Sequence, residues 1–164
     1  MRKLITLFSI CIITLFGCKA KINNSVAGNY EFKTACLGIE LDGSQTLKSW
    51  GNGSSKSDAI EQAYKNAIKD VLFNGISNGR SDCNSKPLIL DFNAKERNEA
   101  YFNVFFRDGG LYREFITNGD GSKNKIEVFI DKKQPGSQYT YSLVIRVLRS
   151  ELKQKMITDG ILKN

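Results

Sequence analysis

Residues 58–73 carry the pattern that most restricts the fold of this chain. Their apolar side chains recur every three or four positions, the spacing of one face of an α-helix. Ala59, Ala63 and Ala67 form a row of small side chains along that face. A row of this kind lets a helix lie close against a sheet, so the pattern predicts both a helix and a sheet beneath it.

Several segments predict the strands and helices that complete such a fold. Alternating apolar residues or flanking turns indicate strands at 29–41, 45–51, 125–131 and 139–147, a short apolar piece at 88–90, and further helices at 93–106 and 150–158. Residues 111–116 fit an extended segment or a short helix. Turn residues join the strands into two hairpins. The order predicts an α+β two-layer domain, an antiparallel sheet of two hairpins with helices on one face.

The amino terminus has the layout of an export signal. A basic start, Met1-Arg2-Lys3, precedes a run of 13 uncharged, mostly apolar residues that is too short to span a bilayer. The run ends in Leu15-Phe16-Gly17-Cys18, which resembles the bacterial lipobox. The resemblance implies that residues 1–17 are a lipoprotein signal peptide, that Cys18 is lipidated, and that two or three acyl chains anchor it stably.

Removal of the signal bounds the mature chain. It leaves 147 of the 164 residues: a short tether at 18–26 and a single α+β domain at 27–164. The formal charge of +7 falls to +5, because Arg2 and Lys3 leave with the signal. The basic residues are dispersed, with no basic helix, so we expect attraction to anionic headgroups and no nucleic acid partner.

The composition and motifs offer little catalytic chemistry. The chain has no histidine, which removes the commonest general base and metal ligand. Gly51 and Gly53 before Lys56-Ser57 lack the spacing of a phosphate loop. The alternating oxygen ligands of 118–124 lack the glycine and glutamate of a calcium loop. We therefore expect no cofactor and no metal.

Pairs of acidic residues are the one feature that could support an enzymatic function. Glu96 with Glu99, or Asp91 with Glu96, could serve a carboxylate-based hydrolase. Any exported domain with 17 acidic residues offers such pairs, so we do not expect an enzyme.

The cysteines that remain in the domain leave two alternatives open. Cys36 and Cys83 could form a disulfide in an oxidising compartment. Alternatively, Cys36 is buried on a strand and Cys83 is exposed in a loop. Two cysteines without histidine cannot complete a zinc site.

Six aromatic residues crowd the stretch between positions 101 and 115. They are Tyr101, Phe102, Phe105, Phe106, Tyr112 and Phe115. Such density could line a groove for a ligand or partner, although aromatic residues more often belong to the core.

A motif of spaced glycines and alanines follows Trp50, near the end of the strand predicted at 45–51. The run from Gly51 and Gly53 to Asp58 and the alanine row is similar to small outer-membrane lipoproteins and to the amino-terminal domain of a flagellar-assembly protein. In that resemblance the glycines free the turn, the alanines permit close packing, and residues 76–122 are an insertion. It implies an assembly or scaffolding role and carries over no catalytic residue.

These inferences together predict a membrane-anchored envelope lipoprotein with a structural, assembly or interaction role. The expected partners are the membrane, through the lipid anchor, and an unidentified envelope protein or peptidoglycan. The alternative is a binding module for a small molecule, glycan or peptide in the aromatic groove. In the lipoprotein family that the lipobox resembles, an aspartate directly after the cysteine resembles an inner-membrane retention signal, and an acidic cluster there looks like a surface-export signal. This chain has Lys19 after Cys18 and no acidic cluster in the tether. We therefore expect the periplasmic face of the outer membrane.

Overall fold

The structure is a computed structural model that describes residues 32–117, 127–129 and 139–163. The predicted signal peptide, lipobox and tether lie outside the described residues, as do the oxygen ligands of 118–124. No helix in the described part of the chain is long and apolar enough to cross a membrane.

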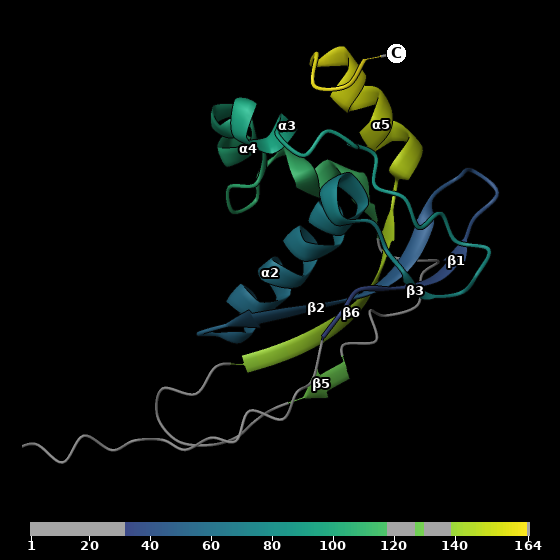
Figure 1. Ribbon diagram of the computed structural model, residues 1–164. Coiled ribbons are helices and arrows are strands. Elements are labelled where there is room, and N and C mark those ends of the chain that lie inside the picture. The colour runs from purple at the N-terminus through teal and green to yellow at the C-terminus, as the bar shows by residue number, and fades with distance from the viewer. Residues whose placement is uncertain (1–31, 118–126, 130–138, 164) are drawn as a thin grey trace, which may run out of the picture. The chain divides into compact units, whose positions relative to one another are not determined.

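The sheet is built around two long antiparallel strands (Figure 1). Its strands are β1 (Ala35–Ile39), β2 (Gln45–Gly53), β3 (Asn78–Gly79), β4 (Ile116–Thr117), β5 (Glu127–Phe129) and β6 (Tyr139–Val147). The order is β3-β1-β2-β6-β4, and β5 also pairs with β6. The two predicted hairpins, β1–β2 and β5–β6, are antiparallel, whereas β3 pairs with β1 in parallel.

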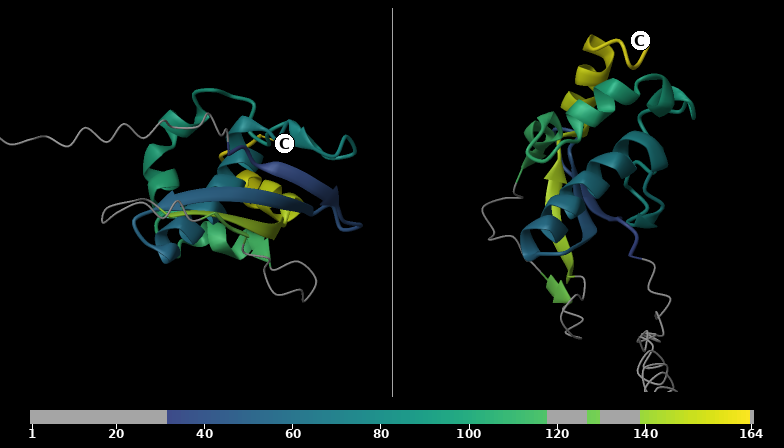
Figure 2. Two further views of the ribbon diagram at one scale, coloured as in Figure 1. Left: turned by 90° about the horizontal axis from the view of Figure 1, so that it is seen from below. Right: turned by 90° about the vertical axis from the view of Figure 1, so that its left-hand side faces the viewer.

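Helices cover one face of this sheet and extend beyond its end. They are α2 (Lys56–Lys69), the π-helix η1 (Asp70–Asn74), α3 (Ala94–Arg97), α4 (Glu99–Phe105), the 3-10 helix η2 (Leu111–Phe115) and α5 (Arg149–Thr158). In Figures 1 and 2, α2 lies along β2 and β6, while α3, α4 and α5 gather towards one end of the sheet. The predicted α+β class is confirmed.

The start of α2 follows from two local side chains. The Ser55 hydroxyl accepts from the backbone N–H of Asp58, and the Asp58 carboxylate accepts from the backbone N–H of Ser55. This reciprocal capping box satisfies amide groups that have no partner within the helix. The negative charge of Asp58 also lies favourably at the positive end of the helix.

The alanine row faces the sheet as predicted. Ala59, Ala63 and Ala67 are fully buried. Two side-chain bonds add to this contact: Ser49 Oγ donates to Ala63 O at 2.8 Å, and Asn66 Nδ2 donates to Trp50 O at 2.8 Å. Helix α2 is therefore held against β2 by packing and by two hydrogen bonds, one from a strand side chain to the helix backbone and one from a helix side chain to the strand backbone.

Gly51 and Gly53 have a different role from the one that the resemblance implied. Both belong to strand β2, and neither has a positive φ. A Cβ on Gly51 would lie 2.9 Å from the Cα of Ala63 and still closer to Ala59 O and Ala63 N. A Cβ on Gly53 would lie 2.5 Å from Ala59 N. These glycines permit the helix backbone to approach the strand and do not free a turn.

The end of the long helix organises the segment that follows it. In η1 the wider π-turn closes with Gly75 N donating to Asp70 O at 2.8 Å. Residues 88 and 89 donate their N–H groups to Val71 O and Leu72 O at 2.9 and 2.8 Å. The short strand predicted at 88–90 is therefore wrong, because this segment pairs with the end of a helix and not with a strand.

Other local predictions differ in detail. The helix predicted at 93–106 is broken at Asn98, whose φ of −114° and ψ of 31° separate α3 from α4. Residues 111–116 form η2 and the start of β4. Ser142 of β6 is 1% exposed, and its neighbours Tyr141 and Leu143 are also buried, so both faces of β6 are covered at this point.

We predict that Gly51→Ala destabilises the protein by about 3 kcal/mol, because the added methyl group must push the backbone of α2 away from β2. The measurement is the urea midpoint of unfolding, followed by circular dichroism.

Gly38→Ala is the matched control. Gly38 also lies in a strand, but a Cβ there would meet nothing within 4 Å. The urea midpoint of Gly38→Ala should remain close to that of the wild-type protein. A Gly51→Ala midpoint equal to that of Gly38→Ala would contradict the close approach.

Candidate functional site

The aromatic residues between 101 and 115 belong to the core. Phe102, Phe105, Tyr112 and Phe115 are between 0% and 7% exposed. The ring of Phe105 meets Phe102 edge-on and stacks with Phe115, and the ring of Tyr112 stacks with Phe106. Tyr101 and Phe106 are partly buried and pack against this core. None of the six lines either of the described pockets. The structure therefore places the most buried of these rings in the core, where aromatic residues more often belong.

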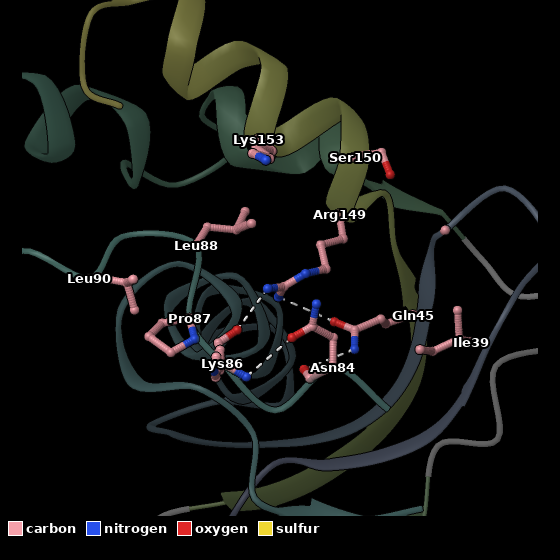
Figure 3. Close-up of a pocket in the computed structure, with 11 residues that line it drawn as sticks. Ile39, Gln45, Asn84, Lys86, Pro87, Leu88, Leu90, Arg149, Ser150 and Lys153 are labelled. Carbon is pink, nitrogen blue, oxygen red and sulfur yellow. Dashed lines mark hydrogen bonds between the residues drawn. The ribbon is translucent and has the colours of Figure 1, made fainter. Parts of the chain in front are cut away.

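A pocket of about 490 Å³ lies where the β1–β2 hairpin, the segment 84–90 and the start of α5 meet (Figure 3). Its lining comprises Ile39, Gly43, Gln45, Asn84, Lys86, Pro87, Leu88, Leu90, Arg149, Ser150 and Lys153. The volume falls within the range of small-molecule sites. These residues come from three parts of the chain, so the pocket exists only in the folded protein.

Arg149 is the most unusual member of this lining. It is only 9% exposed, and its guanidinium donates from Nη2 to Lys86 O at 2.7 Å and from Nη1 to Gln45 Oε1 at 3.4 Å. Both acceptors are neutral, and no carboxylate of the described residues pairs with it. Burial lowers the pKa of Arg149, yet an arginine stays charged in proteins. The pocket thus contains a buried positive charge that has no counterion among the described residues.

Gln45 and a disulfide fix the walls around Arg149. Gln45 is fully buried, and its Nε2 donates to Asn84 O at 3.2 Å. Cys36 of β1 and Cys83 form a disulfide with an S–S distance of 2.09 Å and a Cα–Cα distance of 6.2 Å. The sequence left this pairing open. Because the bond spans 47 positions, it stabilises the fold by about 4 kcal/mol through loss of freedom in the unfolded chain.

The remaining charges of the pocket have the same sign as Arg149. Lys86 and Lys153 also line it, and the described lining contains no acidic residue. The pocket lies at the amino end of α5, where Leu148 provides no side-chain cap. The free amide groups of the first helical turn give this end a partial positive charge. The electrostatics therefore favour an anion.

A second, polar pocket lies beside Glu61 of α2. The Glu61 carboxylate accepts from the Gly109 N–H at 2.9 Å, from the Tyr112 hydroxyl and from the Arg113 guanidinium. Burial opposes ionisation of Glu61, but these three donors outweigh it and lower its pKa to about 2. A carboxylate with this pKa and with its oxygens occupied is a poor general base, so the network is structural.

The carboxylates proposed for a hydrolase do not form a site. Asp91 pairs with Arg97 at the surface, and Glu96 and Glu99 are exposed. None of the three lines either described pocket. Across the described ranges, no group of three or more His, Cys, Asp or Glu residues could hold a metal ion.

Sequence reasoning missed Arg149, Gln45 and Lys86. One signal was present: Gln45 and the apolar Leu47 are two positions apart in the predicted strand, so both face the same side of it. A glutamine facing inward needs buried polar partners. The identity of those partners depends on the fold, because Asn84 and Arg149 are 39 and 104 positions away.

Comparison with known proteins gives no match: no protein-family model, no curated protein and no solved structure matches this chain.

We predict that acid unfolds the protein partly through Glu61. Since the pKa of Glu61 is lower in the folded state than its ordinary value of 4.5, its stabilising contribution is present above pH 4.5 and is lost as the pH falls towards about 2. Glu61→Gln should lower the urea midpoint at pH 7 and flatten the loss of stability between pH 4.5 and pH 2. An unchanged slope in Glu61→Gln would contradict this role.

Proposed function

We propose that this chain is a lipid-anchored protein of the bacterial envelope that serves as a structural, assembly or interaction scaffold and not as an enzyme. The observation that carries the proposal is the sequence Leu15-Phe16-Gly17-Cys18 after a basic start and an apolar run. Cys18 provides the thiol that receives the lipid. The signal peptide leaves the chain, and the domain remains attached through a short tether.

The Cys36–Cys83 disulfide supports export by an independent route. Disulfides persist in oxidising compartments such as the periplasm and are rare in the cytosol. This feature lies in the folded domain and not in the amino-terminal segment, so the two features indicate the same destination for different chemical reasons.

The domain's chemistry supports binding over catalysis. The chain has no histidine, and the most strongly perturbed carboxylate in the described helices, Glu61, is saturated with donors. The pocket at Arg149 provides fixed positive charge and apolar walls but no group suited to proton transfer near neutral pH. A site of this composition holds a ligand in place.

We place the protein on the periplasmic face of the outer membrane, with the membrane itself and an envelope protein or peptidoglycan as partners and no nucleic acid. Lys19 and Lys21 follow Cys18, so the tether is basic. Each lysine near an anionic leaflet contributes about 1 kcal/mol of attraction. The tether keeps the domain within a few nanometres of the bilayer.

Ligand binding is the second candidate function, and the pocket at Arg149 favours it. This site differs from the aromatic groove considered from the sequence, because its lining is cationic and aliphatic. The two functions are compatible, since an anchored module can bind a small molecule and a protein partner on different surfaces.

We predict that Cys18→Ser abolishes lipid attachment. Cells grown with a radioactive fatty acid should label the unchanged protein and not the variant. Cys11→Ser is the control, because Cys11 leaves with the signal peptide and its replacement should leave labelling unchanged. Labelled Cys18→Ser protein would contradict the assignment.

We also predict that protease does not digest the protein in intact cells and does digest it once the outer membrane is permeabilised. A protein known to lie on the cell surface and a periplasmic protein serve as controls. Digestion in intact cells would move this protein to the outer face of the membrane.

A further inference from the structure

We propose that the pocket around Arg149 binds a small amphiphilic anion: a carboxylate or phosphate group carried on a short apolar chain. This inference rests on the binding role proposed above, but it requires neither the lipid anchor nor an envelope location.

The charge of the pocket indicates the head of the ligand. Arg149, Lys86 and Lys153 come together without an acidic residue in the described lining. A buried charge is costly unless it is paired, and Arg149 has only the neutral oxygens of Lys86 and Gln45. An anion in the pocket would supply the missing counterion.

The donors of Arg149 match such a head. A guanidinium carries five N–H donors in a planar fork that fits carboxylate and phosphate groups. Hydrogen bonds to Lys86 O and Gln45 Oε1 engage one N–H each of Nη2 and Nη1. No hydrogen bond within the described part of the chain engages the other donors. Figure 3 shows the side chain reaching from α5 into the pocket.

The apolar lining indicates a ligand body. Ile39, Pro87, Leu88 and Leu90 line the same pocket, and in Figure 3 Leu90 and Ile39 lie on opposite sides of it. Leu90 is 69% exposed and Ile39 is 41% exposed, so both keep apolar surface in contact with water. Inorganic phosphate or acetate would leave that surface wet, whereas an attached hydrocarbon chain would cover it.

Arg149 also holds the segment 84–90 against β2, and this structural role needs to be separated from binding. The bonds to Lys86 O and Gln45 Oε1 stabilise the fold whether or not a ligand is present. The side chains of Lys86 and Lys153 have no such role, since both residues are exposed and neither side chain forms a hydrogen bond or ion pair with a described residue. Replacing these lysines changes the charge of the pocket and leaves the fold intact.

The experiment uses residues 18–164 with Cys18→Ser, which retains the whole folded unit of residues 31–164 without an acyl chain. Calorimetric titration compares octanoate and octyl phosphate, which have head and tail, with acetate and inorganic phosphate, which have the head alone, and with octanol, which has the tail alone. All ligands stay below micelle formation. We expect octanoate, octyl phosphate or both to bind more tightly than every single-feature ligand.

Two further trends follow from the geometry. Lengthening the chain from hexanoate should raise affinity by up to about fourfold for each methylene that becomes buried, until the apolar wall ends. Added salt should weaken binding, because the head is recognised by charge. The stronger of the two head groups identifies the source as a fatty acid or as a phosphate-bearing lipid fragment.

The variants test the residues directly. Arg149→Gln should weaken binding by at least about tenfold. Lys86→Gln and Lys153→Gln should each weaken it by a few fold and reduce its salt dependence. Lys95→Gln, an exposed lysine of α3 outside the pocket, should leave it unchanged. If Arg149→Gln does not fold, as judged by circular dichroism, the lysine variants decide the question.

The proposal is overturned if neither octanoate nor octyl phosphate binds. It is also overturned if octanol, acetate or inorganic phosphate binds as tightly as the better of those two ligands. Unchanged affinity in both lysine variants would also overturn it. A negative result in the lipid-labelling experiment would not affect these binding measurements. The lipid anchor and the anion-binding pocket are therefore tested independently.

Discussion

The close contact between α2 and β2 is the constraint on which the rest of the structure depends. Gly51 has no side chain, and Ala59 and Ala63 have small ones, so the helix backbone lies directly on the strand. Overpacking at such a contact shifts backbones and costs about 1–3 kcal/mol. Once α2 is fixed here, its apolar stripe covers β2 and β6 and sets the direction of the chain beyond it.

That direction leads to the pocket through a series of backbone contacts. The π-turn at the end of the long helix leaves Val71 O and Leu72 O for the N–H groups of residues 88 and 89. The Cys36–Cys83 disulfide holds the preceding segment to β1. Lys86, Pro87 and Leu88 are therefore placed against the start of α5 by bonds at both ends of their segment.

Two arginines in this domain show how the environment determines a role. Arg113 pairs with Glu61, and the pair is satisfied by Tyr112 and Gly109, so it stabilises the packing of η2 on α2. Arg149 is more deeply buried and meets only neutral oxygens. A paired arginine is a structural element, whereas an arginine without a counterion at a pocket wall retains the capacity to bind an anion.

The sequence by itself determined the features that depend on local periodicity. Residues close together in the chain predicted the helix around 58–73, its alanine row, strand β6 and the α+β class. They did so because the spacing of apolar residues within one element indicates which face of that element is buried. Tertiary structure alone decided the pairing of Cys36 with Cys83, the burial of Phe105 and Tyr112 in the core, and the meeting of Gln45 with Arg149. These contacts are between residues up to 104 positions apart. A local sequence pattern does not indicate which distant residues meet in the folded chain.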